Sequence, residues 1–108
     1  LFEKTLLPTV VENDANCMAY AEWKRGAGRG LKHLIAITMG TGVGGGIIVN
    51  GQMVRGAKYG AGEIGQTSID YQGRVGAYGN RGALEDYVGN NEIAADARSA
   101  YELSLIHI

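Results

Sequence analysis

The sequence predicts an α/β fold in which a β-hairpin sheet is flanked by helices. Three observations lead to this prediction. Apolar residues recur at helical spacing over residues 13–25, and residues 33–38 form an apolar run with β-branched members that is typical of a strand. Asn50-Gly51 is a strong hairpin signal, because a type I′ turn needs a positive φ at both central residues.

Composition narrows the class of protein. Eighteen of the 108 residues are glycine, but they have no three-residue period and 45% of the chain is hydrophobic, which excludes collagen and low-complexity linkers. Ten basic and eleven acidic residues give a net charge of -1, so no global field attracts nucleic acid or an anionic membrane. The single cysteine, Cys17, and the lack of a long apolar run predict a cytoplasmic protein with no membrane span.

The first expected elements lie before and after the only proline. Residues 1–7 have helical spacing, and Pro8 ends that segment because proline lacks an amide donor and restricts the residue before it. Residues 9–11 predict a short buried strand.

A longer helix follows this strand. It is expected to start at Asn13 or Asp14, which are both good N-caps, and to end at Gly26. We expect Cys17 to face the core, since a free cysteine usually behaves as a small hydrophobe, and Trp23 to lie in the core or an interface.

Three strands are expected around the Asn50-Gly51 turn. Residues 33–38 and 45–49 form the first two strands, with a glycine-rich tip over residues 38–46 between them. Residues 52–55 form the strand that returns after the turn.

The C-terminal part is expected to contain two further helices. Residues 66–70 are consistent with a strand, and residues 71–81 with a loop that holds three glycines. Residues 83–88 and 91–101 then predict helices, with Asn90 as the N-cap of the second.

The last six residues, 103–108, match a translation of the transposase end sequence used in sequencing-library preparation. We therefore expect adapter read-through here, so that the natural chain continues differently after Glu102. The alternative is a genuine hydrophobic C-terminal strand. Because the chain starts at Leu1, we also expect it to be a piece of a longer protein.

The glycine-rich tip over residues 38–46 has two interpretations. Exposed backbone amides and a threonine hydroxyl could cradle phosphate oxygens there. A tight bulged turn that binds no ligand fits the spacing equally well. A dinucleotide-binding loop is disfavoured, because a hairpin rather than a helix follows the glycines.

Asn13 and Asp14 lie where a strand is expected to end and a helix to begin. A helix N-terminus favours an ionised acid, and a carboxylate there could accept a proton from a substrate hydroxyl as a general base. Simple helix capping by either residue is the alternative. The residues alone do not choose between these roles.

Glu63 and Glu85 lie among glycines further along the chain. Taken separately, each is consistent with a solvated charge or a partner in a helix cap. Taken with Asn13 and Asp14, they form a set suited to a polyol, because a sugar hydroxyl can donate to a carboxylate while it accepts from an amide.

Four ordered motifs between about Pro8 and Glu102 resemble the ROK family of repressors, open reading frames and sugar kinases, which belongs to the actin-like ATPase superfamily. The motifs are Glu12-Asn13-Asp14-Ala15-Asn16, Gly40-Thr41-Gly42-Val43-Gly44-Gly45-Gly46, Ala61-Gly62-Glu63-Ile64-Gly65 and Gly79-Asn80-Arg81-Gly82-Ala83-Leu84-Glu85. The resemblance implies a fragment of an actin-like, ribonuclease H-like fold. Residues 1–25 would end the N-terminal lobe and carry the sugar and catalytic helix, and residues 26–102 would begin the C-terminal lobe.

The resemblance also implies roles for single residues in a glucokinase-like site. Asp14 would be the general base that takes the proton from the attacking sugar hydroxyl, and Asn13 would hold neighbouring hydroxyls. Glu63 and Glu85 would bind the sugar ring, while Gln66 occupies the position of a sugar-contacting histidine. The implied cosubstrate is ATP with Mg²⁺ held largely by its phosphates, on a phosphate loop that contains Thr41, Gly42 and Gly44.

The sequence departs from the family pattern at the zinc-binding motif that most ROK members carry. The four ligand positions of that motif hold Gln66, Gly76, Tyr78 and Ala83 here, and none of these is a competent zinc ligand. The resemblance therefore implies a member without zinc, in which the loop over residues 71–81 is held by packing through Tyr78.

Two classes of function follow from the resemblance. The first is ATP-dependent phosphorylation of a hexose, favoured by Asp14 and the intact phosphate loop, with the fragment inactive on its own. The alternative is a sugar-sensing transcriptional repressor. The implied partners are a hexose and ATP, with a homodimer as a further expectation, no membrane, and nucleic acid only if a helix-turn-helix precedes this segment.

Overall fold

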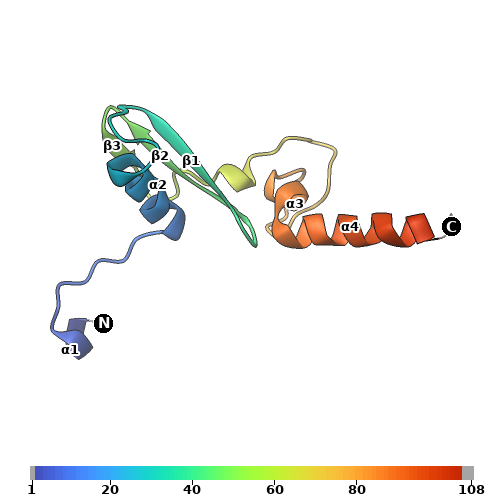
Figure 1. Ribbon diagram of the computed structural model, residues 1–108, viewed down its shortest axis with the longest axis horizontal. Helices are drawn as coiled ribbons and strands as arrows, with labels where there is room; N and C mark the ends of the chain where they lie inside the picture. The colour runs from blue at the N-terminus through green and yellow to red at the C-terminus, as the bar shows by residue number, and fades with distance from the viewer. Residues whose placement is uncertain (1, 106–108) are drawn as a thin grey trace.

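The computed structural model describes residues 2–105 and shows a small antiparallel sheet with one helix packed on it and a C-terminal helical arm (Figure 1). A β-hairpin sheet with flanking helices was predicted, and it is confirmed. The elements are α1 (Phe2–Thr5), α2 (Asp14–Arg25), β1 (Leu34–Met39), β2 (Val43–Val49), β3 (Gln52–Val54), the 3₁₀ helix η1 (Ile64–Gln66), α3 (Glu85–Val88) and α4 (Asn90–Leu105).

The sheet consists of two consecutive hairpins in the order β1-β2-β3. In the second hairpin Asn50 has φ 52° and Gly51 has φ 72°, so the predicted turn with two left-handed residues is confirmed. In the first hairpin the register ends at Met39↔Val43. β2 thus begins two residues earlier than predicted, and the tip between the strands is limited to residues 40–42.

Glycines in β2 allow other elements to approach both faces of the sheet. A Cβ at Gly46 would overlap the Cβ of Ala19 in α2, and a Cβ at Gly44 would lie 2.9 Å from the Cβ of Ala15. On the opposite face, Gly45 makes room for the segment that leads into η1. The buried hydrophobic residues at this crossing are Ala15, Ala19, Val43 and Ile48.

Helix α2 has the predicted extent and packs on the sheet through its small residues. Trp23 is half-buried, and its Nε1 donates a hydrogen bond to the carbonyl of Leu31 at 2.8 Å. Cys17 is exposed, so the prediction that it faces the core was wrong. The helix buries only the stripe that contains Ala15 and Ala19, and position 17 lies outside that stripe.

The N-terminal segment contains the least buried part of the chain. Helix α1 stands apart from the sheet (Figure 1) and is shorter than the helix predicted over residues 1–7. Val10 and Val11 are 91% and 88% exposed, so the buried strand predicted over residues 9–11 was wrong. A strand needs a hydrogen-bonded neighbour, and no part of residues 2–105 pairs with this segment.

A strand predicted over residues 66–70 is also absent from the described residues, and that prediction was wrong. The chain forms η1 at the start of this segment, where Gly65 packs directly against the carbonyl oxygen of Val43 and leaves no space for a side chain. Beyond η1, a single bridge joins Ser68 to Ala83, which is too short a pairing for a strand.

The loop predicted over residues 71–81 is confirmed, and Arg74 ties it to the helices that follow. One guanidinium nitrogen donates to the carbonyl oxygen of Asp86 at 3.0 Å, and another lies 3.0 Å from Oδ2 of Asp96. The guanidinium also lies 5.0 Å from the centre of the Tyr87 ring. Charge and stacking thus fasten this loop to α3 and α4.

The two helices predicted near the C-terminus are confirmed with different bounds. Helix α3 is a single turn, and α4 begins at Asn90. Leu103–Leu105 continue α4 as helix rather than strand, and residues 106–108 lie outside the described residues. The origin of residues 103–108 in adapter read-through stays a prediction.

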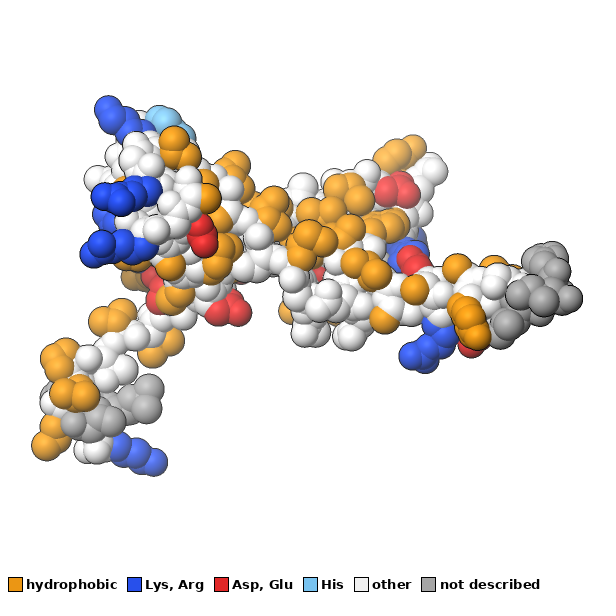
Figure 2. Space-filling view, in the orientation of Figure 1, with side chains coloured by type: hydrophobic (Ala, Val, Ile, Leu, Met, Phe, Trp, Pro, Cys, Tyr) orange, Lys and Arg blue, Asp and Glu red, His pale blue; other side chains and the backbone are white. Residues whose placement is uncertain are grey.

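The surface of the described chain carries many hydrophobic side chains (Figure 2). Ile35, Ile37 and Met39 of β1 are between 51% and 63% exposed, and they share the sheet face opposite α2 because alternate strand residues point to opposite faces. Within residues 2–105, no helix has the length and apolar character needed to cross a membrane.

Candidate functional site

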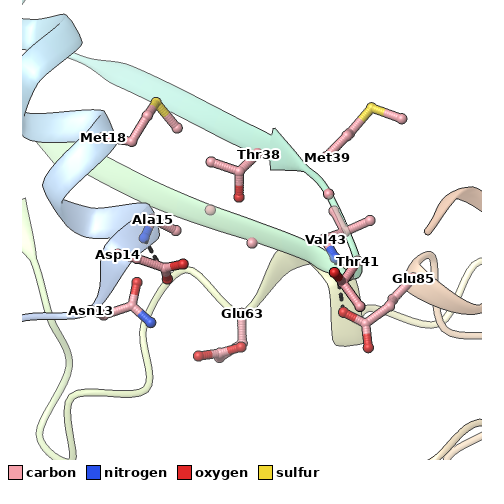
Figure 3. A pocket seen from close by; sticks show the side chains of 14 residues that line it. Asn13, Asp14, Ala15, Met18, Thr38, Met39, Thr41, Val43, Glu63 and Glu85 are labelled. Carbon is pink, nitrogen blue, oxygen red and sulfur yellow. Dashed lines mark hydrogen bonds between the residues drawn. The ribbon is translucent and has the colours of Figure 1, made fainter. Parts of the chain in front are cut away.

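A cavity of about 560 Å³ lies between the N-terminal end of α2 and the tip of the β1–β2 hairpin (Figure 3). The backbone of Gly44 and Gly45 lines it alongside side chains from α2, both strands of the hairpin and two later segments. Its polar side chains are Asn13, Asp14, Thr38, Thr41, Glu63 and Glu85.

The structure brings together seven of the eight residues that the sequence marked as a site. Asn13, Asp14, Thr41, Gly42, Gly44, Glu63 and Glu85 all line this cavity. The eighth, Gln66, lines an adjoining cavity of about 480 Å³ that shares Glu63 and Glu85 with the first. The two cavities therefore meet at a pair of carboxylates.

Of Asn13 and Asp14, the structure uses Asn13 to cap helix α2. Asn13 is the N-cap of α2, and its Oδ1 accepts the backbone amide of Asn16 at 3.0 Å. Asp14 is therefore not needed as the cap. Its Oδ1 accepts the adjacent amide of Ala15 at 2.9 Å, and its carboxylate lies at the exposed rim of the cavity on a helix N-terminus, which favours an ionised acid (Figure 3).

An ion pair behind the cavity, which sequence reasoning missed, fixes the start of α2. Glu12 Oε2 lies 2.7 Å from Nε of Arg55, just after β3. Its other oxygen accepts the amide of Asn13 at 3.0 Å and Nδ2 of Asn16 at 3.3 Å. Hydrogen bonding to Arg55, followed by that to Asn13 and Asn16, holds the pKa of Glu12 below its ordinary value. Only the position of Glu12 beside the helix cap hinted at this contact in the sequence.

Thr41 and Gly42 at the hairpin tip line the cavity. The tip is closed by the Gly40 amide, which donates to the carbonyl of Gly42 at 2.9 Å, and by Asn90, whose amide donates to the carbonyl of Gly40 at 2.9 Å. Within residues 2–105, the amides of Thr41 and Gly42 donate to no acceptor. Two such donors beside a hydroxyl fit an anionic oxygen, so the tip is suited to a phosphate group.

Glu85 is held by two partners at the junction of the cavities. Its Oε2 accepts the backbone amide of Val43 at 2.8 Å, and its Oε1 accepts Nε2 of Gln66 at 3.2 Å. A side chain at Gly42 would overlap the Glu85 carboxylate, so this contact requires glycine at the tip. Glu63 is exposed and lines both cavities, which leaves its carboxylate available to a ligand.

Comparison with known proteins identifies the family of this chain. A model of the ROK family matches residues 1–106. The chain belongs to the ROK family. A glucokinase of Halalkalibacterium halodurans is 44% identical over 95 residues, which cover 87% of this chain and 29% of that glucokinase. The xylose repressor of Bacillus subtilis is 36% identical over 91 residues, which cover 84% of this chain and 24% of the repressor.

Solved ROK structures have the same fold over this segment. The ROK hexokinase from Thermus thermophilus matches with a TM-score of 0.85 and 34% identity, over 94% of this chain and 35% of that one. A ROK glucokinase from Streptomyces griseus, in complex with glucose and AMPPNP, matches with a TM-score of 0.78 and 39% identity, over 85% of this chain and 30% of that one. The predicted fold, part of an actin-like ATPase, is confirmed. The chain spans between 24% and 35% of the length of these four relatives.

Two of the four positions that the resemblance marks as zinc-ligand positions, Gln66 and Tyr78, lie in different surroundings. Gln66 is half-buried beside Glu85, whereas Tyr78 is 78% exposed. The expectation that Tyr78 packs the loop was therefore wrong, and Arg74 fastens the loop instead. Across residues 2–105, no group of three or more histidine, cysteine, aspartate or glutamate side chains is placed to hold a metal ion. Operation without zinc stays a prediction.

Proposed function

We propose that this chain supplies the sugar site and one phosphate loop of an ATP-dependent hexose kinase, with Asp14 as the general base. One observation carries the proposal: Asp14 lines the same cavity as the Thr41-Gly42 tip and Glu63. A phosphate-accepting loop, a proton acceptor and a hydroxyl-binding carboxylate therefore share one space, which is the grouping that transfer of phosphate to a sugar requires.

The chemistry assigned to this chain is positioning and proton transfer. The Asp14 carboxylate accepts the hydroxyl proton of the sugar as that oxygen bonds to the γ-phosphorus and the bond to the β,γ-bridging oxygen breaks. Asn13, Glu63 and Gln66 orient the ring by hydrogen bonds to its other hydroxyls. The amides of Thr41 and Gly42, with Gly44 beside them, receive phosphate oxygens. Mg²⁺ bound to the nucleotide would neutralise phosphate charge.

Glucose or a related hexose is the substrate class that we propose. The support comes from the relatives: glucokinases are similar to most of this chain, and one of the solved ROK structures holds glucose and AMPPNP. In the proposed assignment the hexose lies where the two cavities meet at Glu63 and Glu85.

Substitution of Asp14 by asparagine in the full-length protein tests the proposal. Asp14→Asn keeps the shape and removes the proton acceptor, so kcat for hexose phosphorylation is expected to fall by about 10²- to 10⁴-fold while the sugar KM stays near that of the parent. A coupled assay of ADP release measures both constants. Asp70→Asn is the matched control, because Asp70 is an exposed loop carboxylate whose replacement still offers an acceptor to the Gln72 amide. Unchanged kcat in Asp14→Asn would exclude Asp14 as the base.

A sugar-sensing repressor is the second candidate, and the similarity to a xylose repressor favours it. A repressor needs the sugar site but no proton acceptor, so both the parent and Asp14→Asn would bind sugar without forming a sugar phosphate. Calorimetry with glucose and xylose, run beside the phosphorylation assay, separates the two functions. Sequence-specific DNA binding by the full-length protein would support the repressor.

A further inference from the structure

We propose that Asn80 is a positioning residue of the sugar site. It orients Gln66, which in turn holds Glu85 against the tip of the β1–β2 hairpin. This set of contacts, from Asn80 through Gln66 and Glu85 to the amide of Val43, is called the relay below. The effect of the relay on sugar binding rests on the proposed kinase function, whereas the hydrogen bonds of the relay do not depend on it.

The relay is continuous over three hydrogen-bonded steps. Nδ2 of Asn80 lies 3.3 Å from both the backbone oxygen and Oε1 of Gln66. Nε2 of Gln66 lies 3.2 Å from Oε1 of Glu85, and the Val43 amide lies 2.8 Å from the second Glu85 oxygen. The relay thereby joins four segments: the loop over residues 71–84, η1, the start of α3 and the start of β2.

The partners of the Asn80 and Gln66 side chains determine which terminal atom of each amide is the nitrogen and which is the oxygen. A backbone carbonyl can only accept, so the Asn80 atom that faces the Gln66 carbonyl must be the nitrogen. An ionised carboxylate can only accept, so the Gln66 atom that faces Glu85 must also be the nitrogen. Oε1 of Gln66 is then left to accept from Asn80, and the observed contacts agree with this assignment at every step.

The relay also orients a hydrogen-bond donor in the adjoining cavity. Gln66 and Glu63 both line it, and Nε2 of Gln66 has a second N–H that is not used by Glu85. The cavity therefore offers a donor from Gln66 beside an acceptor from Glu63. Without Asn80, Oε1 of Gln66 loses its donor, and the Gln66 side chain is held by the Glu85 contact alone.

The backbone sets the position of Asn80 independently of the relay. Gly79 and Gly82 have φ values of 80° and 65°, which reverse the chain on either side of Asn80. The carbonyl of Asn80 accepts the amide of Gly76 at 2.9 Å. Its side chain is half-buried and reaches Gln66 without any further movement of the loop.

Amide hydrogen exchange in the full-length protein tests the relay directly. Asn80→Asp is nearly isosteric but cannot donate to either Gln66 oxygen, and Gln66→Met preserves length while removing the amide. In both variants exchange of the Val43 amide is expected to accelerate by about tenfold, the size that corresponds to one lost hydrogen bond. Exchange of the Ile48 amide, which lies in the core of the same strand, reports global unfolding and should stay constant.

Asn91→Asp is the matched control, because it introduces the same charge on an exposed residue near the start of α4. It should leave the exchange of Val43 unchanged. The relay is overturned if Val43 exchanges at the parental rate in both test variants while Ile48 shows that they are folded. If one variant does not fold, the other decides the question.

Kinetics of the full-length protein test the catalytic consequence. Asn80→Asp is expected to raise the sugar KM by about tenfold with a smaller effect on kcat and none on the ATP KM, because the relay positions groups that contact the sugar. An unchanged sugar KM alongside faster Val43 exchange would overturn the role in sugar binding. A parent protein that phosphorylates no hexose would instead overturn the proposed kinase function, and hydrogen exchange would still decide the relay.

Discussion

Gly46 lies on the face of β2 that carries α2, directly beneath Ala19. A Cβ at this position would overlap the Ala19 Cβ and come within 3.1 Å of the Ala15 carbonyl oxygen. Neither atom can rotate away, because one is a Cβ and the other belongs to the helix backbone. The glycine run over residues 44–46 therefore has a packing role in addition to the ligand approach that the sequence predicted, since it brings the start of α2 and Asp14 close to the hairpin.

Gly46→Ala should lower the free energy of unfolding by about 1–3 kcal/mol, the usual cost of adding volume to a tightly packed contact. Urea denaturation followed by circular dichroism measures the change. Gly60→Ala is the control, because a Cβ there meets no atom within 4 Å and the φ of Gly60 is outside the left-handed region. That variant should be neutral, or more stable by about 0.4–1 kcal/mol. Equal denaturation midpoints for the two variants would contradict the packing role of Gly46.

Some residues of the candidate site can be identified from the sequence, and others cannot. Asp14, Glu63 and Glu85 could be identified because each stands in a local motif of glycines and amides. Arg55 and Asn80 could not, because their roles depend on partners 43 and 14 residues away along the chain. Spacing carries information about neighbours on one element, but it says little about which loop will reach a given side chain.

At the scale of elements, the contact between Glu12 and Arg55 connects the start of α2 to the end of β3. The helix that presents Asp14 is thereby held against the sheet at its first turn as well as along its packed face. Because Arg55 lowers the pKa of Glu12 in the folded state, this contact makes stability depend on pH. The contribution is fully present above the ordinary pKa of a glutamate, about 4.3, and is lost as the pH falls through the lowered value.

Arg55→Gln should reduce the difference in urea midpoint between pH 7 and the acid range below pH 4.3. In the parent, acid removes the Glu12 contribution, whereas the variant lacks most of it at both pH values. Arg29→Gln is the control, since Arg29 is exposed and takes part in no ion pair within residues 2–105. A pH dependence in Arg55→Gln as steep as that of the parent would show that the contact between Glu12 and Arg55 is not its source.

Elements were predicted well where local signals suffice. The Asn50-Gly51 turn, the adjacent strands and α2 all have strong short-range determinants, and the structure contains them. The strands predicted over residues 9–11 and 66–70 failed for a different reason. Both segments contain β-branched residues, but a strand also needs a partner, and the partner is decided by distant parts of the chain.

At the scale of the whole molecule, the described chain is elongated. It measures 60 × 36 × 29 Å, and its radius of gyration is 18.1 Å, whereas a compact domain of this length would have about 13 Å. The only large side chain that is fully buried within residues 2–105 is Ile48. This small core agrees with the finding that the chain matches only part of each ROK relative.

Basic side chains gather at the end of the sheet that holds the Asn50-Gly51 turn (Figure 2), where Lys24, Arg29 and Lys32 surround a shallow hollow beside Gly51. The candidate site lies at the other end of β1 and β2, at the hairpin tip. The basic group is thus too far along the sheet to balance the charge of a phosphate bound at the tip.

The charge of the candidate site itself predicts how the isolated 108-residue chain behaves toward ATP. Fourteen residues line the cavity, and they include three carboxylates, Asp14, Glu63 and Glu85, but no lysine or arginine. Two free amides at the tip cannot offset this repulsion for a triphosphate that carries several negative charges. We therefore expect the isolated chain to bind ATP with a Kd of about 1 mM or weaker, even with Mg²⁺ present.

Isothermal titration calorimetry with and without Mg²⁺ checks this expectation, with the full-length protein as the positive control. In the full-length protein, the parts of a ROK kinase that this chain does not cover would supply the remaining contacts to the nucleotide, so the same titration should give a far smaller Kd. A Kd below about 0.1 mM for the isolated chain would contradict the charge argument, because such affinity needs cationic groups that the cavity lacks. It would also show that the hairpin tip alone is a sufficient phosphate site.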